Sequence, residues 1–126
     1  MENKRITAEE LSVLVWLKLL DDFELTTEEG EVVENLSEKI DRFDMMTADI
    51  EPQFFYDTVN KLEELELVTE LSLSDLGTKV ASALLAMENA KNKVTASFKE
   101  IVKFIKDNKE EIISVLEVIG AVVALI

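Results

Sequence analysis

Cysteine and histidine are both absent from this chain of 126 residues. Without them a protein cannot form a disulfide, a zinc site of Cys and His ligands, or the Ser-His-Asp and Cys-His sets of nucleophilic enzymes. The carboxylates do not follow the spacing of an EF-hand, and the sequence has no glycine-rich phosphate loop. The sequence therefore predicts a noncatalytic protein with no catalytic residue, no metal site and no cofactor.

Glycine and proline are scarce, with three and one residues respectively. Few tight turns can form, which favours long helices. Hydrophobic residues make up 48% of the chain, enough for a core in a domain of this length. The lack of cysteine fits a reducing compartment, and residues 1–6 lack the apolar stretch of a signal peptide, so we expect a cytoplasmic, mainly α protein.

Basic residues are also few: 13 Lys and Arg stand against 27 Asp and Glu, a formal charge of −14. Residues 1–65 carry −12 of this charge and residues 66–126 only −2. An acidic surface repels phosphate backbones and anionic membranes. The one basic stretch, residues 91–109, is interpreted as a solvated helix face, with attraction to the acidic N-terminal half or to anionic lipid as alternatives.

Several segments carry signals for the start of a helix. Thr7–Glu10 and Thr26–Glu29 both have the form of a capping box, and Pro52 fits the first turn of a third helix. Residues 67–73 alternate between apolar and polar, which predicts a small hairpin before a fourth helix capped at residues 74–75. The helix after Thr26–Glu29 would bury four apolar side chains, namely Val32, Val33, Leu36 and Ile40.

The run from Val59 to Thr69, followed by Leu73-Ser-Asp-Leu-Gly77, resembles the MarR type of winged-helix domain. The resemblance covers residues 7–92, and its specific motifs lie within residues 59–77. It implies a winged-helix-like domain over residues 1–78 with a minimal β-hairpin, followed by long C-terminal helices over residues 79–126 that dimerise. Two features depart from the family: only four residues separate Val68 from Leu73, which leaves almost no wing, and Glu66 replaces a usual glycine.

In such a domain the third helix reads DNA, which here would make Gln53, Asn60 and Lys61 the DNA-reading residues. Residues 26–68, however, contain only three basic residues against thirteen acids. Phosphate contacts by Lys and Arg supply most of the affinity for DNA. We therefore expect a protein partner with a basic surface and a regulatory role. A DNA-binding transcriptional regulator is the first alternative, and carboxylates that imitate phosphates are a remoter one.

The C-terminal half carries a heptad seam that begins at Val94. The positions predicted to form a homodimer interface are Phe98, Ile101, Ile105, Asn108, Ile112, Val115, Ile119, Val122 and Ile126. In an equally favoured alternative, Asn108 caps a new helix and the two helices form an antiparallel hairpin. Residues 112–126 are apolar nearly all round, so a membrane-proximal accessory protein is a second alternative. At about 22 Å they are too short to cross about 30 Å of hydrocarbon.

Overall fold

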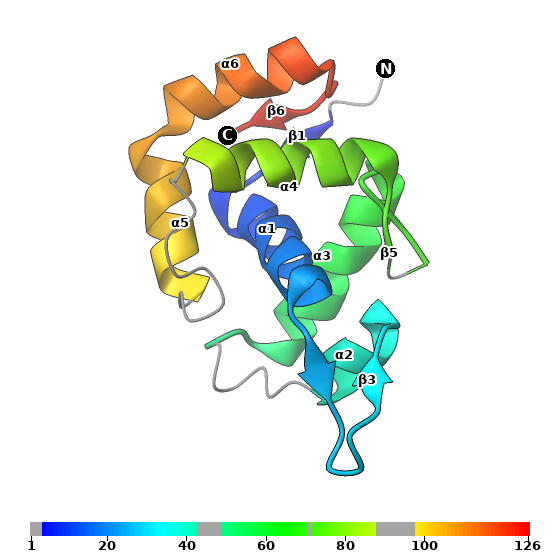
Figure 1. Cartoon of the computed structure of the whole chain (residues 1–126). Helices are drawn as coiled ribbons and strands as arrows, with labels where there is room; N and C mark the ends of the chain where they lie inside the picture. Colours follow the sequence, from blue (N-terminus) through cyan, green and yellow to red (C-terminus); the bar gives the residue numbers. More distant parts are fainter. Residues whose placement is uncertain (1–3, 43–48, 71, 88–97) are drawn as a thin grey trace.

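The computed structural model describes residues 4–42, 49–70, 72–87 and 98–126. Its helices are α1 (Ala8–Asp22), α2 (Leu36–Arg42), α3 (Pro52–Glu64), α4 (Asp75–Met87), α5 (Phe98–Asp107) and α6 (Lys109–Ile119). Its strands, each two residues long, are β1 (Arg5–Ile6), β2 (Leu25–Thr26), β3 (Val32–Val33), β4 (Val68–Thr69), β5 (Ser72–Leu73) and β6 (Ala124–Leu125). The mainly helical fold predicted from the sequence is confirmed (Figure 1).

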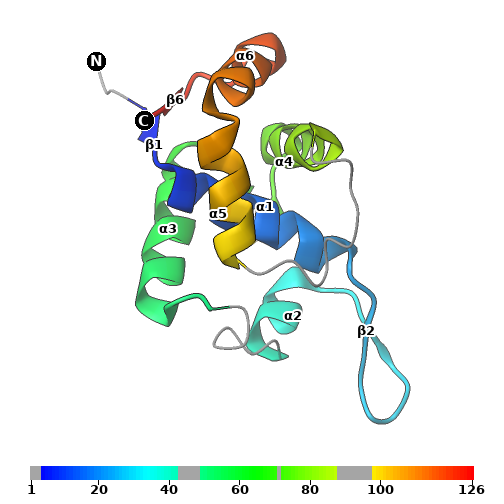
Figure 2. The same cartoon turned by 90° about the vertical axis from the view of Figure 1, so that its left-hand side faces the viewer.

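Helix α1 lies at the centre of the molecule and packs against α2, α3, α4 and α5 (Figure 2). The predicted capping box starts it, since the Thr7 hydroxyl accepts a hydrogen bond from the Glu10 N–H at 3.1 Å and the Glu10 carboxylate accepts one from the Thr7 N–H at 2.9 Å. Nearly every residue from Leu11 to Leu20 is buried, as expected of a helix surrounded by others. Trp16 meets Phe55 of α3 edge to face, with ring centroids 5.5 Å apart.

The prediction of a helix that starts at Thr26–Glu29 is wrong. Strands β2 and β3 form an antiparallel hairpin there instead. The Thr27 hydroxyl accepts a hydrogen bond from the Glu31 N–H at 3.1 Å, and Gly30 adopts a φ of 85° in the left-handed region, so both residues close a turn. Helix α2 begins only after Asn35, whose side-chain oxygen accepts a hydrogen bond from the Ser37 N–H at 2.8 Å.

The segment from α3 to α4 follows the sequence prediction closely. Pro52 occupies the first turn of α3, and strands β4 and β5 form the small hairpin. The Ser74 hydroxyl then accepts a hydrogen bond from the Gly77 N–H at 2.9 Å at the start of α4. A Cβ at Gly77 would overlap the carbonyl oxygen of Leu67. The glycine therefore allows α4 to pack directly against the backbone just before β4.

Helices α5 and α6 are separate, which rules out one continuous C-terminal helix and confirms the break at Asp107–Asn108. The two helices meet at a corner rather than as an antiparallel hairpin (Figure 1). Asn108 does not cap α6 with its side chain. Its amide donates a hydrogen bond to the Phe104 carbonyl at 2.9 Å instead, at the end of α5. Gly120, with a φ of 87°, ends α6.

The last residues return to the start of the chain, where β6 pairs in parallel with β1. The backbone N–H groups of Ala124 and Ile126 donate to the carbonyls of Lys4 and Ile6 at 2.8 and 2.9 Å. One cluster of buried side chains includes residues from α1 through β6, and the division expected between residues 78 and 79 falls inside α4. The C-terminal segment is thus built into the same core as the N-terminal helices.

Candidate functional site

The outer side of α3 presents a stripe of exposed side chains at helical spacing. Gln53, Tyr56, Asp57, Asn60 and Glu64 are all exposed. The Gln53 amide donates to the Asp57 carboxylate at 2.9 Å, so one of the predicted DNA-reading side chains is held by a neighbouring acid. Asn60 lies in the middle of the stripe. Tyr56 keeps 44% of its surface exposed.

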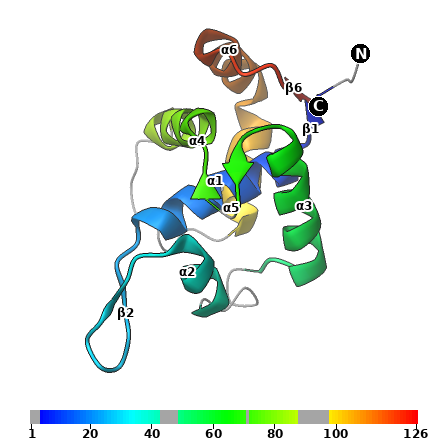
Figure 3. The same ribbon diagram turned by 90° about the vertical axis from the view of Figure 1, so that its right-hand side faces the viewer.

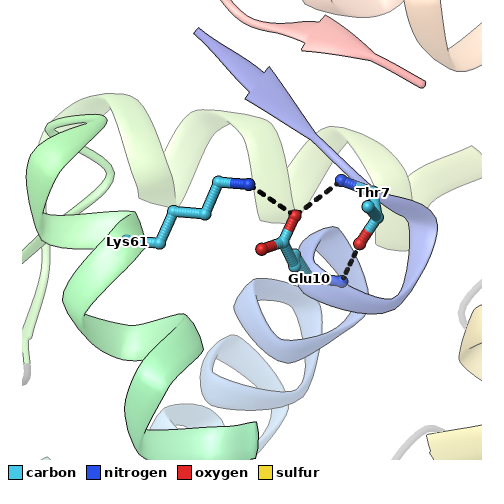
Figure 4. A network of polar contacts seen from close by, with 3 residues as sticks. All are labelled: Thr7, Glu10 and Lys61. Carbon is cyan, nitrogen blue, oxygen red and sulfur yellow. Dashed lines mark hydrogen bonds and ion pairs between the residues drawn. The ribbon is translucent and has the colours of Figure 1, made fainter.

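Lys61, the third predicted DNA-reading residue, does not belong to that stripe. Its ammonium lies 2.8 Å from the Glu10 carboxylate on α1 (Figure 4). The Glu10 side chain is only 15% exposed, and the same oxygen accepts the Thr7 N–H. Burial raises the pKa of Glu10, but the Lys61 ammonium and the Thr7 N–H outweigh it and leave that pKa below its ordinary value. Lys61 therefore joins α3 to α1 through a partly exposed ion pair.

Lys39 of α2 is also turned inward. It is only 5% exposed, and its ammonium donates a hydrogen bond to the Asp21 carbonyl at 2.6 Å. That carbonyl lies in the last turn of α1, where the unsatisfied C=O groups and the helix dipole favour a cation. Two of the three basic residues within residues 26–68 thus have their ammonium groups bound by oxygens of the same chain. The side chain of the third, Arg42, lies outside the described residues.

The carboxylates of the same region point outward. The hairpin from Glu24 to Glu34 contains five glutamates and no Lys or Arg, and all five are exposed. We define the acidic surface as the exposed carboxylates of Glu24, Glu28, Glu29, Glu31, Glu34, Glu38, Asp41, Asp57, Glu63 and Glu64. Two exposed large hydrophobic side chains accompany them, Val32 at 52% and Tyr56 at 44%. Their exposure is a tertiary feature that the sequence pattern did not reveal.

The lysines of α5 support one of the alternatives for the basic stretch. Lys99 forms an ion pair with Asp49 at 2.9 Å, and Lys106 forms one with Glu9 at 2.8 Å. The Lys106 ammonium lowers the pKa of Glu9, and the Asp49 carboxylate raises the pKa of Lys99. These two lysines therefore attract the acidic N-terminal half of their own chain. Residues 91 to 97 of the stretch lie outside the described residues.

The predicted dimer interface is divided by the fold. Phe98, Ile101, Ile105 and Ile112 are buried in the core of the single chain, at 8% exposure or less, and so cannot meet a second subunit. The seam prediction is wrong at these four positions because their apolar side packs onto α1 and its neighbours. Farther along, Asn108, Val115 and Ile119 are half-buried, and Val122 and Ile126 are exposed. Val94 lies outside the described residues.

Within residues 4–42, 49–70, 72–87 and 98–126, no three acids gather as a set of metal ligands. In the same residues no helix combines the length and the apolar character needed to cross a membrane. Comparison of the chain with protein-family models, with curated protein sequences and with solved structures found no match.

Proposed function

We propose that this chain is a noncatalytic, winged-helix-like interaction domain whose acidic surface binds a basic surface of another protein, in a regulatory role. The proposal depends on one observation. Lys39 is buried and Lys61 is paired with Glu10, whereas the neighbouring carboxylates point to solvent. The surface that a partner meets is therefore more negative than the sequence composition of residues 26–68 alone indicates.

The exposed tyrosine favours a protein partner over a merely solvated face. Tyr56 lies between Gln53 and Asn60 on α3, next to the exposed Asp57. Tyrosines that combine apolar area with a polar tip are enriched at the centres of protein interfaces. Exposed carboxylates on the same helix as such a side chain suit a partner that supplies Arg or Lys next to an apolar pocket.

Two backbone features support the winged-helix part of the proposal. Glu66 has a φ of 64°, in the left-handed region that favours glycine, at the position where the resembled family carries glycine. Gly77, the last residue of the resembling motif, lies against the Leu67 carbonyl, where no Cβ fits. The order of elements departs from the expected one, since the hairpin β2–β3 stands where the start of a helix was expected.

DNA binding through Gln53 and Asn60 is disfavoured by the same charges. Lys and Arg contacts with phosphates supply most of the affinity of a DNA-binding protein, and carboxylates near the phosphates oppose binding. The charged side chains of the α3 stripe, Asp57 and Glu64, are both negative and exposed. DNA binding thus becomes the outcome that would contradict the proposal.

The test measures binding of the full chain to a fluorescent arginine-rich peptide and to random duplex DNA, over a series of salt concentrations. We expect peptide binding that weakens with salt, and no DNA binding at moderate salt. The variant Tyr56→Ala with Asp57→Lys should weaken peptide binding about tenfold or more. A matched control, Ser114→Ala with Glu117→Lys, changes the net charge equally on α6 and should weaken it much less.

Two outcomes would count against the proposal. Equal losses of peptide affinity in the α3 double variant and in the control double variant would mean that peptide binding depends only on net charge. Submicromolar binding of duplex DNA that disappears in Gln53→Ala with Asn60→Ala would establish the DNA-binding alternative instead.

A further inference from the structure

Strand β6 has one edge without a partner strand. It belongs to a two-stranded sheet, in which the N–H groups of Ala124 and Ile126 donate hydrogen bonds toward β1. Because the N–H groups of successive residues in a strand point to alternate sides, those of Val123 and Leu125 point away from β1. Among the residues that the structure describes, neither of these two N–H groups has an acceptor. An unpaired edge of this kind can pair with another extended chain.

A cleft lies beside this edge. Its volume is about 630 Å³, and it is lined by the consecutive residues 121–125 together with Ile113 and Glu117 of α6. Side chains alternate between the two faces of an extended chain, so consecutive residues line one cleft only where the backbone itself borders it. Figure 3 shows β6 between β1 and α6 at this end of the molecule. The cleft therefore opens on the unpaired edge of β6.

The hollow continues past the end of β6. Leu125 also lines a second cavity of about 550 Å³, whose other walls come from residues 7–9, from α5 and from the start of α6. Val122 and Ile126, which are 77% and 54% exposed, border the first and the second cavity respectively. A hollow that follows a strand along its length, with uncovered apolar side chains at both ends, suits an extended chain better than a compact ligand.

The charges at the cleft differ in sign from those of the chain as a whole. Lys4 and Arg5 line the cleft, and neither side chain forms an ion pair with a described residue. Glu117 is the one acid among the described lining residues, so two cations and one acid give a net +1, in a chain of formal charge −14. The hairpin β2–β3 with its five exposed glutamates lies at the opposite end of the molecule (Figure 1), beyond the screening length of about 8 Å at physiological salt. The cleft therefore favours an anionic occupant.

We infer that an extended, acidic segment of another protein binds in this cleft and adds to β6 as a third strand. Carbonyl groups of the segment accept hydrogen bonds from the N–H groups of Val123 and Leu125, and its carboxylates meet Lys4 and Arg5. Because side chains alternate along a strand, a segment of alternating acidic and apolar residues directs its apolar side chains together to one side, toward Ile113. Main-chain hydrogen bonds supply affinity in this mode of recognition, and the side chains supply specificity.

This site goes beyond the proposed function, because it takes a ligand of the opposite charge. The acidic surface binds cationic side chains, whereas the cleft at the other end of the molecule binds carboxylates. Failure of one proposal leaves the other intact, since the arginine-rich probe and an acidic probe report on separate surfaces.

The probe is a fluorescein-labelled peptide, Val-Glu-Val-Glu-Val-Glu, and fluorescence anisotropy measures its binding to the full chain. We expect a dissociation constant below about 100 μM. A control peptide with Pro in place of the two central residues lacks two of the N–H groups of a strand and should bind about tenfold more weakly or worse. Lys4→Glu with Arg5→Glu should weaken binding of the first peptide about tenfold or more. The matched control is Lys79→Glu with Lys103→Glu, two exposed lysines that do not line the cleft, and it should weaken binding less than about threefold.

Amide hydrogen exchange, followed by NMR, tests the strand pairing itself. Saturating peptide should slow exchange at Val123 and Leu125 about tenfold or more, and should slow it by a smaller factor at Ala124, whose N–H is already bonded. Circular dichroism checks that both double variants keep their helices. The inference would be overturned by an absence of binding up to about 1 mM, by equal binding of the proline peptide, by equal losses in the two double variants, or by unchanged exchange at Val123 and Leu125.

Discussion

Glu10 provides a sharp test of how the fold is held together, because one carboxylate serves two purposes. It accepts the Thr7 N–H at 2.9 Å to complete the capping box, and it lies 2.8 Å from the Lys61 ammonium across the α1–α3 contact. Glu10→Gln keeps an oxygen that can accept the Thr7 N–H but removes the charge. Glu10→Ala removes both interactions.

The expected changes in the free energy of unfolding follow from these contacts. A helix cap contributes about 1 kcal/mol. The Lys61 side chain is 36% exposed, so water screens the ion pair, and we assign it about 0.5 to 1 kcal/mol. Glu10→Gln should therefore lower the free energy of unfolding by up to about 1 kcal/mol, and Glu10→Ala by about 2 kcal/mol. For a chain of this length the alanine variant should melt roughly 6 °C lower.

The effect of Glu10→Gln should depend on pH. The pKa of Glu10 in the folded chain is lower than its ordinary value of 4.5, so protons bind more readily to the unfolded chain. The stabilisation by this carboxylate is complete above the unfolded pKa and is lost as the pH falls through the folded pKa. The difference between the original chain and Glu10→Gln should thus be full at pH 7 and should shrink below about pH 4.5.

Urea unfolding followed by circular dichroism at several pH values measures these differences. A double-mutant cycle with Lys61→Met isolates the ion pair from the cap. Glu64→Gln is the matched control, since it removes a carboxylate from an exposed position of α3. If Glu10→Gln and Glu64→Gln destabilised the chain equally at pH 7, or if the Glu10→Gln difference did not change with pH, our account of this network would be refuted.

Two further substitutions test the backbone of the segment that resembles the winged-helix motif. Gly77→Ala should lower the free energy of unfolding by roughly 3 kcal/mol, because its methyl group would overlap the Leu67 carbonyl. Urea unfolding measures this change, and a loss below about 1 kcal/mol would mean that α4 can move away. Glu66→Gly should raise the melting temperature through a gain of about 0.5 to 1 kcal/mol, since glycine relieves a left-handed φ of 64°. Asn60→Gly in the middle of α3 is its control and should lower stability instead.

The sequence by itself determined the parts of the fold that depend on neighbours along the chain. The Thr7–Glu10 capping box, the place of Pro52 and the Ser74 cap all follow from contacts between residues within a few positions of each other. The continuous burial of α1 could be predicted as well, because an apolar run without a polar side needs neighbours all round. The absence of cysteine and histidine likewise limits the possible chemistry through composition alone.

Local signals failed where two conformations fit the same residues. Thr26–Glu29 has the form of a capping box, yet Gly30 and the β-branched pair Val32–Val33 close and extend a hairpin there. A threonine hydroxyl that accepts a nearby backbone N–H, as Thr27 does from Glu31, suits either structure, so the choice depends on the strand pairing that follows. The heptad seam failed for a related reason. Its spacing marks an apolar side of a helix but not the surface that covers it, and here α1 packs against α5.

Only the tertiary structure decided which charges reach solvent. Lys39 and Lys61 resemble ordinary surface lysines in the sequence, but Lys39 contacts the Asp21 carbonyl, 18 positions away, and Lys61 contacts Glu10, 51 positions away. The pairing of β1 with β6 joins the two ends of the described chain in the same way. Composition fixed the total charge, and the fold fixed its placement, because contacts between distant residues depend on how the helices pack rather than on local spacing.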